Sequence, residues 1–306
     1  MKLNTWRSQL ADILPFYYGW VIVASTVAVS FSTRTIMAVA TLSVFVVPMT
    51  EELGMSRGLF SGAVSLGGLC AVLTSPLVGR WLDRYGSGML IAASSVLTGI
   101  LSVALSLVSS PLAFYSLYVP GRMIFAGPVE LGLPTAISNW FIRRRPLALA
   151  IDSVAKGAGL SVMPLAVQFI ISGWDWRTGW FSLGIITFAL GVVPSMLFMV
   201  RRPEDMGLEP DPVPSDSQET KESFVSTGTR SLEAGTETNF TVRQALNTRA
   251  FWVLAVFSAA GLMVQAGISL HQVPHYINRG LPPPSAALTA STFAFSQILG
   301  GPFWSA

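Results

Sequence analysis

The sequence between two long apolar stretches of the chain reads Gly79-Arg80-Trp81-Leu82-Asp83-Arg84-Tyr85-Gly86. It begins and ends with glycine and carries an aspartate beside an arginine, which predicts a tight, solvated turn. The apolar stretch on either side has about the 20 residues that a helix needs to cross the hydrocarbon core of a bilayer. We therefore interpret these eight residues as the charged connection between two membrane-spanning helices.

The composition of the whole chain also indicates a membrane protein. Its 306 residues are 51% hydrophobic and only 11% charged, whereas soluble domains carry roughly 25% charged residues. A soluble enzyme needs a more charged surface, and a disordered chain needs low hydrophobicity, so both classes are excluded. The single cysteine, Cys70, excludes an internal disulfide and a cysteine-based zinc site. With only two histidines besides, we expect no metal and no cofactor.

Apolar runs long enough to cross a bilayer occur eight times, which predicts an all-α membrane protein. The first run is too long for a cleaved signal peptide and contains Arg34, so we interpret it as a transmembrane helix. The predicted spans cover residues 18–46, 57–79, 89–109, 112–138, 146–172, 178–200, 250–272 and 285–306.

The positions of lysine and arginine predict the orientation, because basic residues gather in cytoplasmic loops. If the N-terminus is cytoplasmic, the outside loops hold only Arg57, Arg177 and Arg279. The net charge of +3 then reflects membrane topology and gives no support for nucleic-acid binding. We expect a multi-pass protein of the bacterial plasma membrane. Its inside segments hold Lys2, Arg7, Arg80, Arg84, Arg143, Arg144, Arg145, Arg201, Arg202, Lys221, Arg230, Arg243 and Arg249.

Residues 201–249 divide the apolar pattern into two parts. They are rich in acidic residues and in Ser, Thr, Gly and Pro, a composition that cannot bury enough apolar surface to fold alone. We therefore predict an N-terminal six-helix transmembrane bundle over residues 1–200 and a cytoplasmic linker over 201–249. An incomplete C-terminal bundle, containing helices 7 and 8, follows over 250–306.

A weak internal repeat relates the two bundles. Pro48 and Pro76 recur at one constant separation as Pro274 and Pro302, and internal repeats are common in secondary transporters. A second half as long as the first would need roughly four further helices beyond Ala306. We therefore expect about eight helices of twelve, and a chain that is incomplete at its C-terminal end.

The stretch from Gly79 to Gly86 resembles the G-x-x-x-D-R-x-G signature of the major facilitator superfamily. It lies between the second and third predicted helices, where that family carries its signature. The resemblance implies the fold of that family, with Gly79, Asp83, Arg84 and Gly86 as a cytoplasmic gating motif. We expect Asp83 and Arg84 to hold this gate through contacts between helix ends, with partners among Arg143, Arg144 and Arg145.

Shorter segments resemble bacterial monocarboxylate transporters and oxalate/formate antiporters. This resemblance implies a small organic anion as substrate, moved with protons or by exchange. The monocarboxylate branch usually carries a lysine in helix 1 and an arginine in helix 8. Here helix 1 offers Arg34, and helix 8 has no basic residue. The segments are Tyr18-Gly19-Trp20, Trp140-Phe141-Ile142-Arg143-Arg144-Arg145, Arg202-Pro203-Glu204-Asp205-Met206-Gly207-Leu208 and Phe251-Trp252.

Charged residues inside the predicted spans are candidate site residues, because each costs about 2.5–3.5 kcal/mol at the centre of a bilayer. Arg34 and Arg122 are candidates for binding substrate, since a guanidinium presents a fork of donors that matches a carboxylate. A structural pair with an acid such as Glu130 is an open alternative for both. The charged residues within spans are Arg34, Arg122, Glu130, Asp152 and Lys156.

Glu130 is the candidate proton carrier, because burial of a carboxyl group favours its neutral form. It follows Arg122 by eight residues, which turns it by roughly 80° around a regular α-helix. The two side chains therefore need not share a face of the helix.

The other polar candidates lie in helices 5 and 7. Asp152 and Lys156 are spaced so that they can pair on one helix, and a structural intramembrane ion pair is favoured over a transport role. His271, at the outer end of helix 7, can exchange protons near neutral pH, although a simple interfacial position is favoured. Gln265 is a candidate uncharged substrate-binding residue.

These patterns together predict a secondary active transporter that moves a small organic anion by alternating access. Its partners are the anion, protons in one version of the mechanism, and the lipid bilayer. Two other functions stay open: a truncated membrane protein or sensor that does not transport, and a drug exporter of the same fold. An intramembrane enzyme is disfavoured, because no nucleophile–histidine arrangement lies within the predicted core.

Overall fold

The computed structural model describes residues 2–211, 244 and 246–304, and of residues 2–5, 34–37 and 297–304 it describes the backbone only. Most of the predicted linker, residues 212–243 and 245, lies outside the described residues. Every regular element among the described residues is helical, which confirms the all-α fold class. The chain forms two compact units, Met1–Asp211 with Ser269–Ala306, and Pro212–Ile268.

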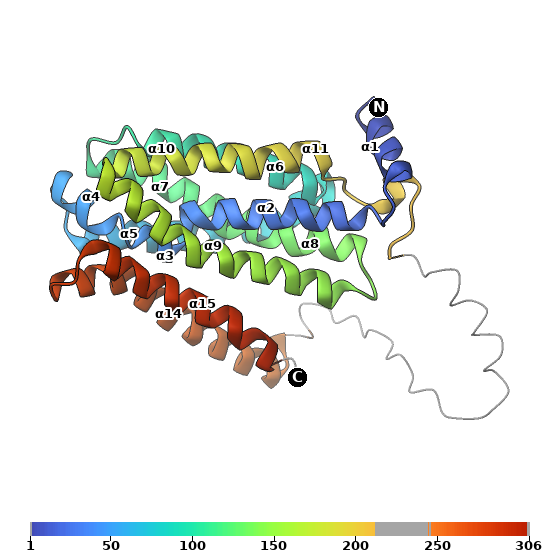
Figure 1. Ribbon diagram of the computed structural model, residues 1–306. Helices are drawn as coiled ribbons and strands as arrows, with labels where there is room; N and C mark the ends of the chain where they lie inside the picture. The colour runs from blue at the N-terminus through green and yellow to red at the C-terminus, as the bar shows by residue number, and fades with distance from the viewer. Residues whose placement is uncertain (1, 212–243, 245, 305–306) are drawn as a thin grey trace. The chain divides into compact units, whose positions relative to one another are not determined.

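The larger unit contains a bundle of long helices (Figure 1). Its elements, in chain order, are α1 (Lys2–Ile13), α2 (Gly19–Met37), α3 (Val39–Leu42), α4 (Val46–Glu52), α5 (Arg57–Tyr85), α6 (Ser87–Leu105), α7 (Pro111–Ile124), the π-helical segment η1 (Phe125–Val129), α8 (Glu130–Trp140), α9 (Arg145–Gly173), α10 (Trp176–Ile186), the π-helical η2 (Thr187–Val192), α11 (Val193–Phe198), the 3₁₀ turn η3 (Pro203–Met206), the last residues of α14 (Arg249–Asn278), and α15 (Pro283–Trp304).

The smaller unit contributes the first part of α14. Thr248 precedes this helix, and its Oγ1 accepts a hydrogen bond of 3.3 Å from the backbone N–H of Phe251. The indole N–H of Trp252 donates to the carbonyl of Leu246 at 2.9 Å. These contacts fix the start of the helix, because the first N–H groups of a helix have no partners within it.

Five helical segments of the described chain are long and apolar enough to cross a membrane by themselves. The first predicted span, 18–46, is instead divided, because Ala38 has extended backbone angles (φ −72°, ψ 140°) and ends α2 at Met37. Its uninterrupted apolar part is the shorter stretch Gly19–Thr33. The fourth span forms α7, η1 and α8, and it carries two charged residues. The five segments are Arg57–Tyr85, Ser87–Leu105, Arg145–Gly173, Trp176–Phe198 and Arg249–Asn278.

Apolar side chains cover the outside of the bundle as well as its interior. On α5, the side chains of Leu69, Val72 and Leu73 are exposed by 55%, 67% and 71%. Exposed aliphatic surface of this extent suits contact with lipid rather than with water. Inside, stacked aromatic rings fill the core, with ring centroids 4.4 Å apart for Phe45 and Trp180.

Two close helix contacts position the segments that matter for the site. α9 packs on α2 and on α15. A Cβ atom at Gly159 of α9 would lie only 3.1 Å from the backbone oxygen of Phe31 in α2. Small residues let membrane helices approach this closely. On α15 the small side chains of Ala286, Ala287, Ala290 and Ala294 are buried.

The end of the bundle opposite the Gly79–Gly86 stretch is held by an ionic cluster. Arg177 Nη2 lies 2.6 Å from Glu52 Oε1, and Trp176 donates its indole N–H to Glu52 Oε2 at 2.5 Å. Arg177 also donates through Nη1 to the carbonyls of Ser106 and Val108. The connections that leave α4, α6 and α9 are thereby tied together.

The cluster predicts a pH dependence of stability. The hydrogen bonds that Trp176 and Arg177 donate to the Glu52 carboxylate lower its pKa from its ordinary value of 4.5. A carboxyl group with a lower pKa in the folded state stabilises the fold above its unfolded pKa, and this stabilisation is lost as the pH falls through the folded pKa. Glu52→Gln is therefore expected to lower the unfolding temperature at pH 7, and to lower it progressively less as the pH falls below 4.5. For an exposed ion pair in a chain of this size the decrease is up to about 2–4 °C.

Thermal unfolding of the purified protein in detergent, across this pH range, measures the effect. Glu51→Gln is the matched control, because Glu51 is the exposed neighbour on the same helix. Equal effects of Glu52→Gln at pH 3 and pH 7 would contradict the pKa assignment.

Candidate functional site

Asp152 and Lys156 form an ion pair on α9. Lys156 Nζ lies 2.9 Å from Asp152 Oδ2. Ser30, on α2, donates its hydroxyl to Asp152 Oδ1 at 2.5 Å. The Asp152 carboxylate therefore has partners on two helices, α2 and α9. Asp152 as a whole is only 1% exposed.

Arg122 lies on α7, about 16 Å from the start of that helix at Pro111, at 1.5 Å per residue. Its side chain begins directly against α5, because a Cβ atom at Gly67 would lie 2.6 Å from Arg122 Cβ and 2.7 Å from its Cγ. Its guanidinium carbon lies 5.3 Å from the centroid of the Phe125 ring, a distance at which a cation is attracted to an aromatic face. The arginine is thus partly buried within apolar helices.

The π-helical segment η1 lies between Arg122 and Glu130 and changes the angle between their positions around the helix axis. A π-helical turn holds one residue more than an α-helical turn. At about 100° per residue, one absorbed residue turns the following chain back by that amount. Glu130 is then displaced from Arg122 by roughly −20° rather than 80°. With this irregularity, the two positions fall on nearly the same side of the helix by this arithmetic, a relation that a regular α-helix does not give.

The remaining sequence-predicted residues take no part in the contacts given above. Arg34 lies on α2, and its side chain is outside the described residues. Gln265 lies on α14 within the smaller unit. His271 lies on α14 with an exposed side chain.

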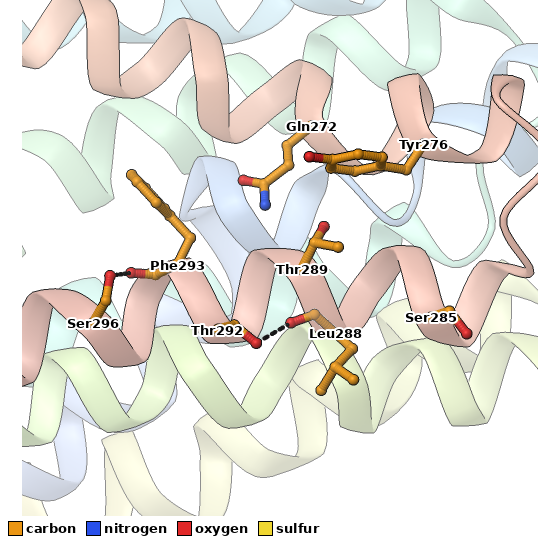
Figure 2. Close-up of a pocket in the computed structure, with 8 residues that line it drawn as sticks. All are labelled: Gln272, Tyr276, Ser285, Leu288, Thr289, Thr292, Phe293 and Ser296. Carbon is orange, nitrogen blue, oxygen red and sulfur yellow. Dashed lines mark hydrogen bonds between the residues drawn. The ribbon is translucent and has the colours of Figure 1, made fainter.

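A groove of about 400 Å³ lies between the last turns of α14 and the first turns of α15 (Figure 2). Figure 2 shows Gln272 and Tyr276 reaching from α14 toward Thr289 on α15. Gln272 Oε1 is buried and has no hydrogen-bond partner among the described residues. The lining offers hydroxyl, amide and aromatic groups and no charged side chain. Its residues are Gln272, Tyr276, Ser285, Leu288, Thr289, Thr292, Phe293 and Ser296.

Three of the hydroxyl groups in the groove are acceptors rather than donors toward a solute. Thr289, Thr292 and Ser296 each give their hydroxyl proton to a carbonyl of their own helix. Their oxygens keep lone pairs that can accept from a solute. Within the described part of the chain, no group of three or more His, Cys, Asp or Glu side chains could hold a metal ion.

Comparison with known families decides what kind of protein carries this arrangement. The sequence profile of the Major Facilitator Superfamily matches residues 22–306, nearly the whole chain. The chain belongs to the Major Facilitator Superfamily. This confirms the family resemblance of the Gly79–Gly86 stretch, and with the apolar helices it makes the chain a multi-pass integral membrane protein.

Two relatives within the superfamily are transporter-like by name. The uncharacterized MFS-type transporter YcxA of Bacillus subtilis (strain 168) is 27% identical over 164 residues, covering 52% of this chain and 39% of its own. An MFS-type transporter of Gibberella moniliformis (strain M3125 / FGSC 7600) is 29% identical over 119 residues, covering 36% of this chain and 28% of its own. The chain therefore spans less than half of the length of the curated relatives that it matches.

The superfamily signature folds differently from the predicted turn. α5 continues through Tyr85, and the turn consists of Gly86 alone, with φ +84°. A Cβ atom at Gly86 would lie 2.6 Å from Arg201 Cγ, and Arg201 Nη2 donates to the carbonyl of Asp83 at 2.6 Å. Glycine is needed at Gly86 because of both its backbone angle and this close approach. Gly79, in contrast, is helical and has open space around it.

The charged side chains of the signature point outward. Asp83 and Arg84 are exposed, and the guanidinium of Arg84 lies 5.4 Å from the ring centroid of Tyr85. The basic segment that begins at Arg143 makes its own contacts, including a hydrogen bond from the backbone N–H of Arg144 to Asp211 Oδ2 at 2.7 Å.

Sequence reasoning missed three residues of the site. Ser30 and Gly67 lie on α2 and α5, far in sequence from Asp152 and Arg122, and serine and glycine are common in membrane helices. Gln272 offered a signal that was available, since an amide in an apolar helix is a costly choice unless it has a partner or a ligand.

Proposed function

We propose that the protein is a secondary active transporter that moves a small organic anion across the membrane by alternating access. The transport is coupled to protons or proceeds by exchange. The N-terminus lies in the cytoplasm, and the membrane is the plasma membrane of a bacterium. In this arrangement residues 1–200 form the N-terminal bundle, 201–249 a cytoplasmic linker, and 250–306 the start of the C-terminal bundle.

The position of Arg122 carries the proposal. A guanidinium partly buried among apolar helices is expensive unless it serves a pair or a polar pathway. Its stem is seated against Gly67, which leaves little freedom for its first two carbons. A guanidinium presents a planar fork of donors that suits bidentate binding of a carboxylate. Arg34, on α2, is the second proposed anion-binding residue.

The α14–α15 groove complements these arginines. It has no charged side chain, so it suits the uncharged part of a solute rather than its carboxylate. In the same proposal Gln265 contributes a further neutral donor, Asp152 and Lys156 neutralise each other, and His271 assists proton entry. Asp83 and Arg84 act at the cytoplasmic gate, where the Arg201 contact with the Asp83 carbonyl adds a partner outside the Arg143–Arg145 segment.

Proton coupling is proposed for Glu130, which gives a testable prediction. The purified chain in proteoliposomes is expected to take up a labelled monocarboxylate, faster with an inward proton gradient. Glu130→Gln cannot carry a proton, so this acceleration is expected to disappear while exchange of internal for external carboxylate continues. Glu51→Gln, at an exposed position, is expected to behave like the wild type.

Competition within the same assay identifies the solute class. Small carboxylates are expected to inhibit uptake, whereas lipophilic cations are expected to leave it unchanged. Inhibition by the cations alone would favour a drug exporter, and unchanged proton stimulation in Glu130→Gln would contradict its role as proton carrier.

A further inference from the structure

In the Asp152–Lys156 pair the aspartate is buried, whereas the lysine is partly exposed. The Asp152 side chain is 2% exposed, whereas the Lys156 side chain is 17% exposed. Both carboxylate oxygens of Asp152 are occupied, one by Ser30 and the other by Lys156. The accessible part of the cluster is therefore the lysine.

The ammonium group of Lys156 has more N–H donors than its contact with Asp152 uses. A lysine ammonium carries three N–H donors, and Asp152 is the acceptor that Nζ meets among the described residues. The helix α15, which packs on α9, brings no charged residue between Pro283 and Trp304. The helix α15 thus supplies no second counter-charge for Lys156.

The depth of Lys156 makes these spare donors significant. Lys156 lies about 16 Å along α9 from its first residue, Arg145. This places it near the middle of the 29-residue helix. In the hydrocarbon region no water satisfies unpaired polar groups. A partly exposed ammonium at this depth is stabilised by a further acceptor, and the acceptor that best matches its charge is an anion.

We propose that Lys156 binds the carboxylate group of the transported solute, and that Asp152 and Ser30 position its ammonium group. The inference rests on the proposed function and adds a third cation to the anion site. Asp152 neutralises the charge of Lys156 while no solute is bound, which lowers the cost of a lysine within the membrane. An arriving carboxylate shares the ammonium with Asp152 through its spare N–H donors, and it leaves without breaking the ion pair that holds the lysine.

Substitution of both members of the pair separates binding from structure. Lys156→Gln is expected to raise the half-saturation concentration for a labelled carboxylate roughly 10- to 100-fold, the value of one charge-assisted hydrogen bond. It is expected to leave uptake of the uncharged amide of the same compound unchanged. Lys156→Arg retains the charge and is expected to keep most carboxylate uptake. The double variant Asp152→Asn/Lys156→Gln has no unpaired charge, so it folds, and it is expected to keep the defect of Lys156→Gln.

A serine pair tests the positioning role. Ser30→Ala removes the hydrogen bond to Asp152 and is expected to weaken carboxylate uptake roughly tenfold, the value of a hydrogen bond to a charged group at its low end. Ser153→Ala is the matched control, because the Ser153 hydroxyl is exposed and donates to the carbonyl of Leu149 in its own helix. Equal uptake by these two variants would contradict the role of Ser30.

The outcomes distinguish this inference from the function on which it rests. Normal carboxylate uptake by the double variant, or equal losses for carboxylate and amide in Lys156→Gln, would show that the pair is structural and overturn the inference alone. Failure of the wild-type chain to take up any carboxylate would overturn the proposed function, and the inference with it.

Discussion

Arg122→Gln is expected to reduce the efficiency of carboxylate uptake by roughly 10- to 100-fold. A charge-assisted hydrogen bond contributes about 1.5–3 kcal/mol, and each 1.4 kcal/mol is about a factor of ten in affinity. Glutamine keeps a polar side chain of similar reach but removes the positive charge. The measurement is uptake of a labelled monocarboxylate in proteoliposomes, at several concentrations, with the amount of folded protein determined separately.

Two further variants show whether the charge or its geometry matters. Arg122→Lys keeps the charge and loses the planar fork, so we expect uptake between that of the wild type and that of Arg122→Gln. Arg80→Gln is the matched control, because Arg80 is exposed near the end of α5, and it is expected to transport normally. Normal uptake by Arg122→Gln would remove the arginine from the substrate site and restore the structural alternative.

Gly67→Ala is expected to damage both stability and transport. The added Cβ would lie 2.6 Å from Arg122 Cβ and 3.2 Å from the backbone oxygen of Val119. Backbone atoms cannot move aside cheaply, so α5 and α7 must separate, and overpacking of this kind costs about 1–3 kcal/mol. The same displacement moves the stem of Arg122, so carboxylate uptake should fall along with the unfolding temperature.

The adjacent glycine provides the control. Gly68 has nothing within 4 Å of an added Cβ, and alanine in a helix is favoured over glycine by up to about 1 kcal/mol. Gly68→Ala should therefore be neutral or stabilising and should transport normally. If the two alanine variants unfold at the same temperature, the close contact between α5 and α7 is not as described.

Much of the fold follows from hydropathy, because a bilayer-crossing helix needs a long apolar run and such runs are easily recognised. Local spacing also predicts the Asp152–Lys156 contact, since side chains four residues apart on a helix are neighbours. The prediction of a turn over residues 79–86 is wrong for a local reason. Glycine is tolerated within a helix at modest cost, so Gly79 did not have to end α5.

The rest of the site depends on features without a local signal. Whether Arg122 and Glu130 lie on the same side of the helix depends on the π-helical segment η1. A helical wheel drawn at 100° per residue assumes a regular α-helix and does not include this segment. Pro128 lies within η1, and a proline inside a membrane helix is the sequence feature that points to such an irregularity. Ser30 and Gly67 act through contacts between helices, and a pattern read along one helix does not reveal its partner on another.

The most direct test of the central claim is equilibrium binding of a labelled small carboxylate to the purified 306-residue chain, compared with binding of its uncharged amide. The account predicts saturable binding of the carboxylate that is at least about tenfold tighter than binding of the amide, the value of one charge-assisted hydrogen bond. Equal affinity for the two compounds, or no saturable binding of the carboxylate by folded protein, would contradict an anion site built on Arg122.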